Sequence, residues 1–98
     1  MTEIVRIVTA EPVIHGVLKI AWSDGFEGIV DIRHLLAIGK VYTPLRDPVF
    51  FQSVKVTEHG HSIEWIGTDG RQIDFGADSL QILSRTQADL VLKASRAA

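Results

Sequence analysis

A chain of 98 residues is long enough for one folded domain and too short for two. With 46% hydrophobic and 22% charged residues, it has the composition of a globular protein and not of a disordered one. The net charge of −2 argues against a dedicated nucleic-acid-binding surface, and the absence of cysteine excludes a disulfide framework, a thiolate nucleophile and a cysteine metal site.

The opening segment, MTEIVRIVTAEP, carries acidic side chains and no uninterrupted apolar stretch, so it does not have the pattern of a secretory signal peptide. No apolar run approaches the roughly 20 residues that cross a bilayer. Residues 85–98 are mildly basic, with Arg85, Lys93 and Arg96 against Asp89 alone. The lack of a signal-peptide pattern and of a membrane-spanning run predicts a cytoplasmic protein.

The first third of the chain has the pattern of strands. Residues 4–16 alternate partly, and Pro12 either ends this strand or lies at an exposed sheet edge. Residues 17–22 and 26–32 alternate more regularly and flank the turn Ser23–Gly25. Because Asp-Gly between two apolar runs is a strong hairpin signal, we expect an antiparallel pair over residues 17–32.

Two short helical segments follow the hairpin. The sequence RHLLAIGK predicts a two-turn helix, with Asp31 as its N-cap or near-cap and Gly39 in the left-handed conformation at its end. Asp47 followed by Pro48 is typical of the start of a short helix or 3₁₀ turn.

The second half returns to strands and then to helix. SVKVTE, SIEWIG and RQIDFG are separated by the turn-like clusters HGH and TDG. Asp78 with Gln81 has capping-box spacing for one short helix, and Thr86 with Asp89 repeats that spacing for a final helix. The predicted fold is α+β: a small antiparallel sheet domain of two hairpin groups, with short helices packed on one side and a C-terminal helix. We expect residues 1–84 to form this domain and residues 85–98 a C-terminal helix, either part of it or an association element.

Three segments, IAWSDGFEGIVDIRHLL, TPLRDPVFFQSVKV and IEWIGTDGRQIDFGADSL, follow one another in an order that resembles the bacterial family catalogued as domain of unknown function 2442. The positions that carry the likeness are Asp24, Gly25, Asp31, Leu45, Asp47, Pro48, Phe51, Trp65, Asp74 and Leu80. The resemblance implies a small α+β domain and transfers no catalytic residue. Some relatives look like one half of toxin–antitoxin-type gene pairs, which implies an antitoxin-like role. Others continue into a helix-turn-helix, whereas this chain ends after one predicted helix.

The segment EHGHSIEW holds two of the four histidines of the chain. On a strand, His59 and His61 would face the same side and could bind a divalent metal together with Glu58 or Glu64. Gly60 between them instead indicates a turn, and the flanking apolar strands require one at this point. We favour the turn and expect no metal or other cofactor. His59 and His61 are the weak candidates for metal ligands.

Other polar residues have simple structural interpretations. A pair of His34 with Asp31 could orient an imidazole for base catalysis, but no matching nucleophile is present, and surface exposure of His34 is favoured. Asp24 and Asp69 belong to turns, where an aspartate side chain bonds nearby backbone N–H groups. The glycines do not form a phosphate-binding loop.

The final helix is apolar over more than half of its circumference, whereas Asp89, Lys93 and Arg96 share one narrow sector. Either the helix is packed on two sides within its own domain, or it packs against a partner such as a second copy. The second explanation is favoured, with an interface formed by Leu90, Val91, Ala94 and Ala97.

Three functions are compatible with these patterns. The favoured one is a non-enzymatic protein-interaction or regulatory module, homodimeric or bound to another protein, without contact to nucleic acid or membrane. The alternatives are a fragment of a nucleic-acid-binding transcriptional regulator that uses the basic tail, and a metal-dependent or acid–base enzyme that uses His59, His61 and nearby carboxylates.

Overall fold

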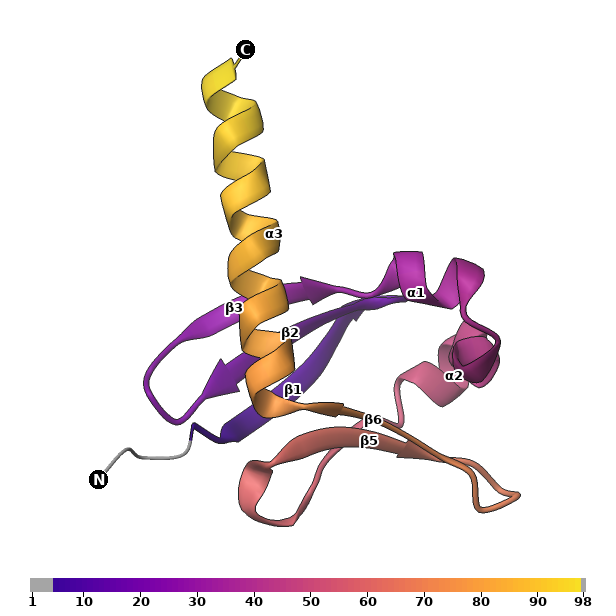
Figure 1. The fold of residues 1–98 in the computed structure, drawn as a ribbon. Coiled ribbons are helices and arrows are strands. Elements are labelled where there is room, and N and C mark those ends of the chain that lie inside the picture. Colours follow the sequence, from indigo (N-terminus) through magenta and orange to yellow (C-terminus); the bar gives the residue numbers. More distant parts are fainter. Residues whose placement is uncertain (1–4, 98) are drawn as a thin grey trace.

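A computed structural model of the chain describes the backbone of residues 5–97 and the side chains of residues 5–90. The fold is α+β, as predicted: two three-stranded antiparallel sheets with the strand orders β1-β2-β3 and β4-β5-β6. Figure 1 shows the two sheets one above the other, with a long C-terminal helix, α3, beside them. The strands are β1 (Ile7–Ile14), β2 (Val17–Trp22), β3 (Glu27–Asp31), β4 (Lys55–Val56), β5 (Ser62–Ile66) and β6 (Gln72–Gly76).

The first sheet follows the alternation of its sequence. In β2, Leu18, Ile20 and Trp22 are buried, whereas Lys19 on the opposite face is exposed. The predicted pairing of residues 17–22 with 26–32 is confirmed, with Val17 opposite Asp31 and Ala21 opposite Glu27. Strand β1 continues through Pro12 at the edge of the sheet, which the missing proline N–H permits.

Short helical segments connect the two sheets at one end of the molecule (Figure 1). They are α1 (Arg33–Ile38), the 3₁₀ helix η1 (Lys40–Arg46) and α2 (Pro48–Phe51). Asp47 caps α2 as predicted, because its side chain accepts a hydrogen bond from the Val49 N–H. The left-handed conformation predicted for Gly39 is wrong. Gly39 is extended, with φ −89° and ψ 116°, because η1 begins directly after it.

The second sheet repeats the turn chemistry of the first. At the predicted Asp-Gly turns, Gly25 and Gly70 have φ values of 88° and 85°, which glycine adopts without steric cost. Asp24 accepts a hydrogen bond from the backbone N–H two residues later, and so does Asp69. The remaining turn, η2 (Glu58–Gly60), lies where the sequence HGH predicted a turn.

The hydrophobic core lies between the two sheets. Trp22 from the first sheet and Trp65 from the second are both buried, and each places its indole N–H on a distant backbone carbonyl. The Trp22 Nε1 donates to Ala77 O at 2.9 Å, and the Trp65 Nε1 donates to Phe51 O at 2.8 Å. These bonds satisfy the only polar atom of each indole, so both rings are buried without an unpaired donor.

The C-terminal helix, α3 (Ala77–Ala97), begins directly after β6. The two separate helices predicted from Asp78 and Thr86 are wrong, because residues 77–97 form one continuous helix. Thr86 does not cap a new helix; its hydroxyl donates to the Ile82 carbonyl one turn earlier, as helical threonines commonly do. The expected division after residue 84 therefore falls inside α3. Among the described residues, no helix is long and apolar enough to span a membrane.

Candidate functional site

The surface where α3 meets β3 contains several side-chain hydrogen bonds between distant parts of the chain. β3 is an edge strand, so its odd-numbered residues direct backbone N–H and C=O groups away from β2. The Gln87 amide forms two bonds with this edge: Oε1 accepts from Asp31 N at 2.9 Å, and Nε2 donates to Asp31 O at 2.8 Å. The Ser84 hydroxyl donates to Ile29 O at 3.1 Å. Two side chains of α3 thus take the place of a neighbouring strand.

Gly28 allows α3 to approach β3 this closely. A Cβ atom at Gly28 would overlap the Ser84 Oγ and lie 3.3 Å from the Ser84 Cβ and 3.2 Å from the Phe26 ring. Ser84 itself is 2% exposed, although it is polar. A side chain at position 28 would therefore push the helix away from the strand whose edge it covers.

The end of β3 is also connected to α1. The Asp31 carboxylate accepts hydrogen bonds from Arg33 Nε at 2.9 Å and Nη2 at 2.6 Å, and from the Arg33 backbone N–H at 3.0 Å. These bonds hold the pKa of Asp31 below its ordinary value and raise the pKa of Arg33. Asp31 is therefore a near-cap of α1 that pairs with Arg33 and not with His34, which is exposed.

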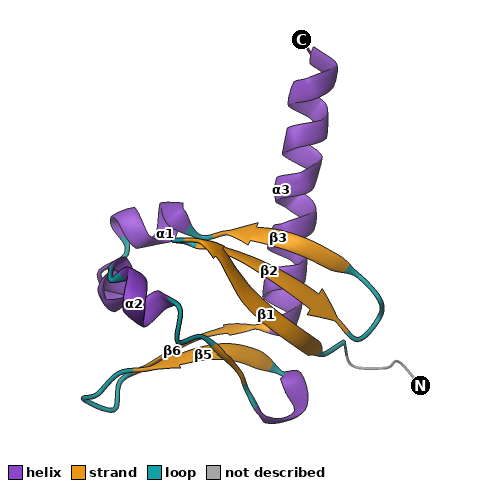
Figure 2. Ribbon diagram, turned by 180° about the vertical axis from the view of Figure 1, so that it is seen from behind, coloured by secondary structure: helices purple, strands orange, loops and turns teal. Residues whose placement is uncertain are grey.

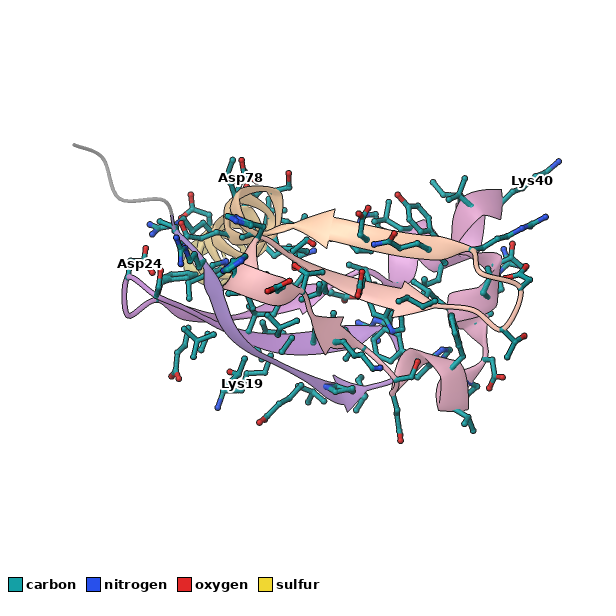
Figure 3. All side chains as sticks on the ribbon, turned by 90° about the horizontal axis from the view of Figure 1, so that it is seen from below. Lys19, Asp24, Lys40 and Asp78 are labelled. Carbon is teal, nitrogen blue, oxygen red and sulfur yellow. The ribbon has the colours of Figure 1, made fainter. Side chains whose placement is uncertain are left out.

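The turn before β3 makes a third connection to α3. The Asp24 carboxylate accepts from Phe26 N at 3.0 Å and from the Gln81 side-chain amide at 3.1 Å, and these bonds lower the pKa of Asp24. The Arg85 guanidinium lies 4.4 Å from the centre of the Phe26 ring. In Figure 3, Asp24 and Asp78, the latter in the first turn of α3, lie at the same end of the molecule.

Beside these polar contacts lies a hollow of about 650 Å³ between β3 and α3. Its apolar lining comes from Phe26 and Ile29 on one side and from Ala88 and Leu90 on the other. Ile29 is 49% exposed and Leu90 is 61% exposed, although both are large apolar side chains. The hollow therefore presents apolar surface that the described part of the chain does not cover.

The packed face of α3 ends before the helix does. Ala77, Leu80 and Ser84 are buried and Gln87 is half-buried, but Ala88, Asp89 and Leu90 are all exposed. Figure 1 shows the rest of α3 extending beyond the first sheet, and Figure 2 shows the same projection from behind. Of the four expected interface residues, Leu90 lies at the hollow. The side chains of Val91, Ala94 and Ala97 lie outside the described residues.

The two candidate metal ligands lie at the η2 turn. The ring centres of His59 and His61 are 6.1 Å apart, and His59 Nε2 is 3.7 Å from Glu58 Oε1. His59 has a φ of 68°, so the segment is a tight turn and not the extended strand that would align both imidazoles. Within the part of the chain that the structure describes, no three His, Cys, Asp or Glu side chains are grouped as metal ligands would be.

Two other acidic side chains are also separated. Asp24 lies in the β2–β3 turn and Asp69 in the β5–β6 turn, which are at opposite ends of the molecule (Figure 1). His15 Nε2 lies 2.8 Å from Leu45 O, and its ring meets Phe51 edge-on, so this histidine has a structural partner. These side chains form no paired-carboxylate or His–carboxylate arrangement.

Sequence reasoning did not find Gly28, Ser84 or Gln87. The available signal was weak: a serine and a glutamine three positions apart, on the helix stripe that Ala77 and Leu80 begin. Such a stripe can indicate hydrogen bonds to a strand edge only after the strand has been placed beside the helix.

Comparisons of the chain with protein-family models, with curated proteins and with solved structures found no match. The resemblance to the family catalogued as domain of unknown function 2442 therefore stays a prediction that rests on the sequence segments quoted above.

Proposed function

We propose that this protein is a non-enzymatic interaction or regulatory module of the cytoplasm that acts as a homodimer through α3. An antitoxin-like role is the form of this function that the family resemblance favours. The observation that carries the proposal is the unequal use of α3: the helix packs on its own domain up to Gln87 and then continues past the first sheet.

Two physical arguments support association at this surface. The part of α3 that follows Gln87 is about ten residues long, and a helical segment of this length has marginal stability in water unless its apolar face packs on another surface. The apolar hollow formed by Phe26, Ile29, Ala88 and Leu90 lies beside the point where α3 leaves its domain. A second copy that brings its own α3 to this hollow would bury the same residues on both subunits, which is the usual two-fold arrangement.

The test is the solution mass, measured by light scattering over a range of concentrations. The variant Leu90→Glu places a charge in the expected interface. We expect the dissociation constant of its dimer to be at least about tenfold higher than that of the unmodified protein. Ile82→Glu is the matched control, because Ile82 is also an exposed apolar residue of α3, at 66%, but does not line the hollow.

A chain that ends at Ala88 sharpens the same test. It keeps Ser84 and Gln87, so the hydrogen bonds of α3 to β3 remain while Leu90 is removed. A dimer that becomes a folded monomer on this truncation supports the proposal. A full-length protein that is monomeric at all accessible concentrations, with unchanged circular dichroism, contradicts it.

A further inference from the structure

The four edge strands of the two sheets are not equally protected. In β3, the edge is bonded by Gln87 and Ser84. Strand β1 contains Pro12 and two irregularities in its pairing with β2, and β4 is only two residues long. Each of these features discourages the addition of another strand. Strand β6 has none of them.

The hydrogen-bond pattern shows which groups of β6 face outward. At its two ends, Gly67 N donates to Arg71 O and Ala77 N donates to His61 O, so the odd-numbered residues of this segment bond β5. In an antiparallel pair the even-numbered residues then direct N–H and C=O away from β5. These residues are Gln72, Asp74 and Gly76. Within the described part of the chain, no hydrogen bond uses the outward groups of Gln72 and Asp74 or the N–H of Gly76. The Gly76 carbonyl lies directly before α3 and accepts the first hydrogen bond of that helix.

The side chains on the two faces of β6 differ in character. Towards the core, Ile73 is buried and Phe75 is half-buried, with the Phe75 ring stacked on Tyr42 at 5.5 Å. On the opposite face, Gln72 and Asp74 are exposed. In Figure 3, β6 forms the rim of the second sheet, and no other strand lies beyond it. A strand added here would have an apolar inner side and a polar outer side.

The outer face of the second sheet also has a defined order of charges. Lys55 of β4 lies opposite Glu64 of β5, and Glu64 lies opposite Asp74 of β6. Glu64 further accepts a hydrogen bond from the Gln72 side chain at 2.6 Å. Asp74 forms no salt bridge within the described residues, so the charge row ends in an unpaired carboxylate at the open edge.

From these observations we propose that β6 binds an extended peptide segment of a partner protein as a fourth strand, and that a lysine or arginine of this segment pairs with Asp74. The outward N–H and C=O groups of Gln72 and Asp74 and the N–H of Gly76 supply the main-chain bonds. The cation continues the row that begins at Lys55, and cross-strand pairs of opposite charge are favourable. Apolar side chains at alternate positions of the peptide cover Phe75 and Tyr42.

A second copy of the same chain fits this edge less well. In the fully overlapping antiparallel pairing of two β6 strands, Asp74 lies directly opposite Asp74 of the other copy. Like charges in that position destabilise the pair. The charge of the edge thus favours a basic peptide over self-association.

The experiment measures binding of a short capped peptide in which valine and lysine alternate, by amide chemical shifts and hydrogen exchange on the full chain. We expect saturable binding and slower exchange of the Asp74 and Gly76 amides, while the Ile73 and Phe75 amides, already bonded to β5, change little. The variant Asp74→Asn should weaken binding about two- to fivefold, and Asp74→Lys about tenfold or more. Asp89→Lys, which makes the same charge change on the exposed part of α3, should leave binding unchanged.

Three peptide controls separate strand addition from nonspecific attraction. An alternating valine–glutamate peptide tests the sign of the charge. A peptide of the same lysine–valine composition with contiguous lysines tests the period of two. An N-methylated peptide, which lacks the edge-facing donors, tests the backbone bonds. We expect none of the three to protect the Asp74 amide; equal binding of any one of them overturns the proposal.

This inference deepens the proposed function as an interaction module, but it uses a different surface and therefore fails separately. Loss of dimerisation in Leu90→Glu with intact peptide binding leaves the β6 proposal standing. Protection of the Asp74 and Gly76 amides that rises with protein concentration in the absence of peptide identifies a second copy as the occupant and overturns it. Absence of any peptide binding overturns it as well.

Discussion

Strands β3 and β6 are both five residues long and both lie at the edge of a three-stranded antiparallel sheet. They differ in what lies beside them. The outward carbonyl and N–H of Asp31 in β3 are both bonded by the Gln87 side chain, whereas those of Asp74 in β6 have no partner among the described residues. A primary amide on a helix can therefore close a strand edge as a neighbouring strand would. The second sheet has no such amide at β6, so that edge stays open to a further strand.

We expect the largest difference between the β3 and β6 edges in the hydrogen exchange of their outward amides. The Asp31 amide donates to Gln87 Oε1 at 2.9 Å and should exchange only when α3 opens, whereas the Asp74 amide faces solvent. We expect the Asp31 amide to exchange at least about 100-fold more slowly than the Asp74 amide, measured by NMR in the unliganded protein at low concentration.

Gln87→Ala should remove this difference and make the β3 edge resemble the β6 edge. Gln81→Ala is the matched control, because Gln81 lies on the same helix but bonds the Asp24 side chain and not a strand edge. If the Asp31 amide stays slow in Gln87→Ala, the amide of Gln87 is not what protects the edge.

The next effect concerns the close approach at Gly28. Gly28→Ala should lower the free energy of unfolding by about 1–3 kcal/mol, because the new methyl group overlaps the Ser84 Oγ. In the Ser84→Ala background the penalty should be smaller by about 1 kcal/mol, since the oxygen is gone and only the Cβ remains at 3.3 Å. Urea unfolding of the original protein, the two single variants and the double variant gives the four free energies of this double-mutant cycle. Strict additivity of the two substitutions would show that the positions do not act on each other.

The smallest effect is the pH dependence of the Asp31–Arg33 pair. Arg33 lowers the pKa of Asp31 in the folded state, so the stabilisation is present above the ordinary value of 3.8 and is lost as the pH falls through the lower folded-state pKa. Because the Asp31 side chain is 36% exposed and Arg33 60% exposed, solvent screening limits the contribution to less than about 1 kcal/mol.

Asp31→Asn isolates this charge, because asparagine keeps an oxygen that can accept from the Arg33 backbone N–H. We expect the variant to be less stable than the original at pH 7 and the difference to shrink as the pH is lowered below 3.8. Urea unfolding at a series of pH values measures it. A difference that is the same at neutral and strongly acidic pH would mean that the charge of Asp31 is not involved.

Local chemistry made most of the fold predictable from the sequence. The alternation of Leu18, Ile20 and Trp22, the Asp-Gly turns and the Asp47–Pro48 cap each depend on residues a few positions apart, and each formed as expected. The errors at Gly39 and Thr86 arose where neighbouring structure decided the outcome. At Gly39 the immediate start of η1 required an extended conformation. At Thr86 the helix continues without a break, so the threonine does not cap a new helix.

The candidate site could not be predicted in the same way. Its defining bonds join residues 55 to 57 positions apart, such as Ser84 with Ile29 and Gln81 with Asp24. Neither serine nor glutamine has a pattern that indicates a strand edge as its partner. Among the expected interface residues the structure describes the side chain of Leu90 alone, and this side chain contributes to the hollow beside β3.

The separation of 56 residues between Asp31 and Gln87 also has a consequence during synthesis on the ribosome. The β2–β3 hairpin is local in sequence and can form as soon as it emerges, but the amide that closes its edge is translated much later. At about 5–20 residues per second, the delay is roughly 3–11 seconds. For that time every nascent copy carries an uncovered strand edge, so neighbouring nascent chains on one messenger RNA have the opportunity to pair through β3 before α3 exists.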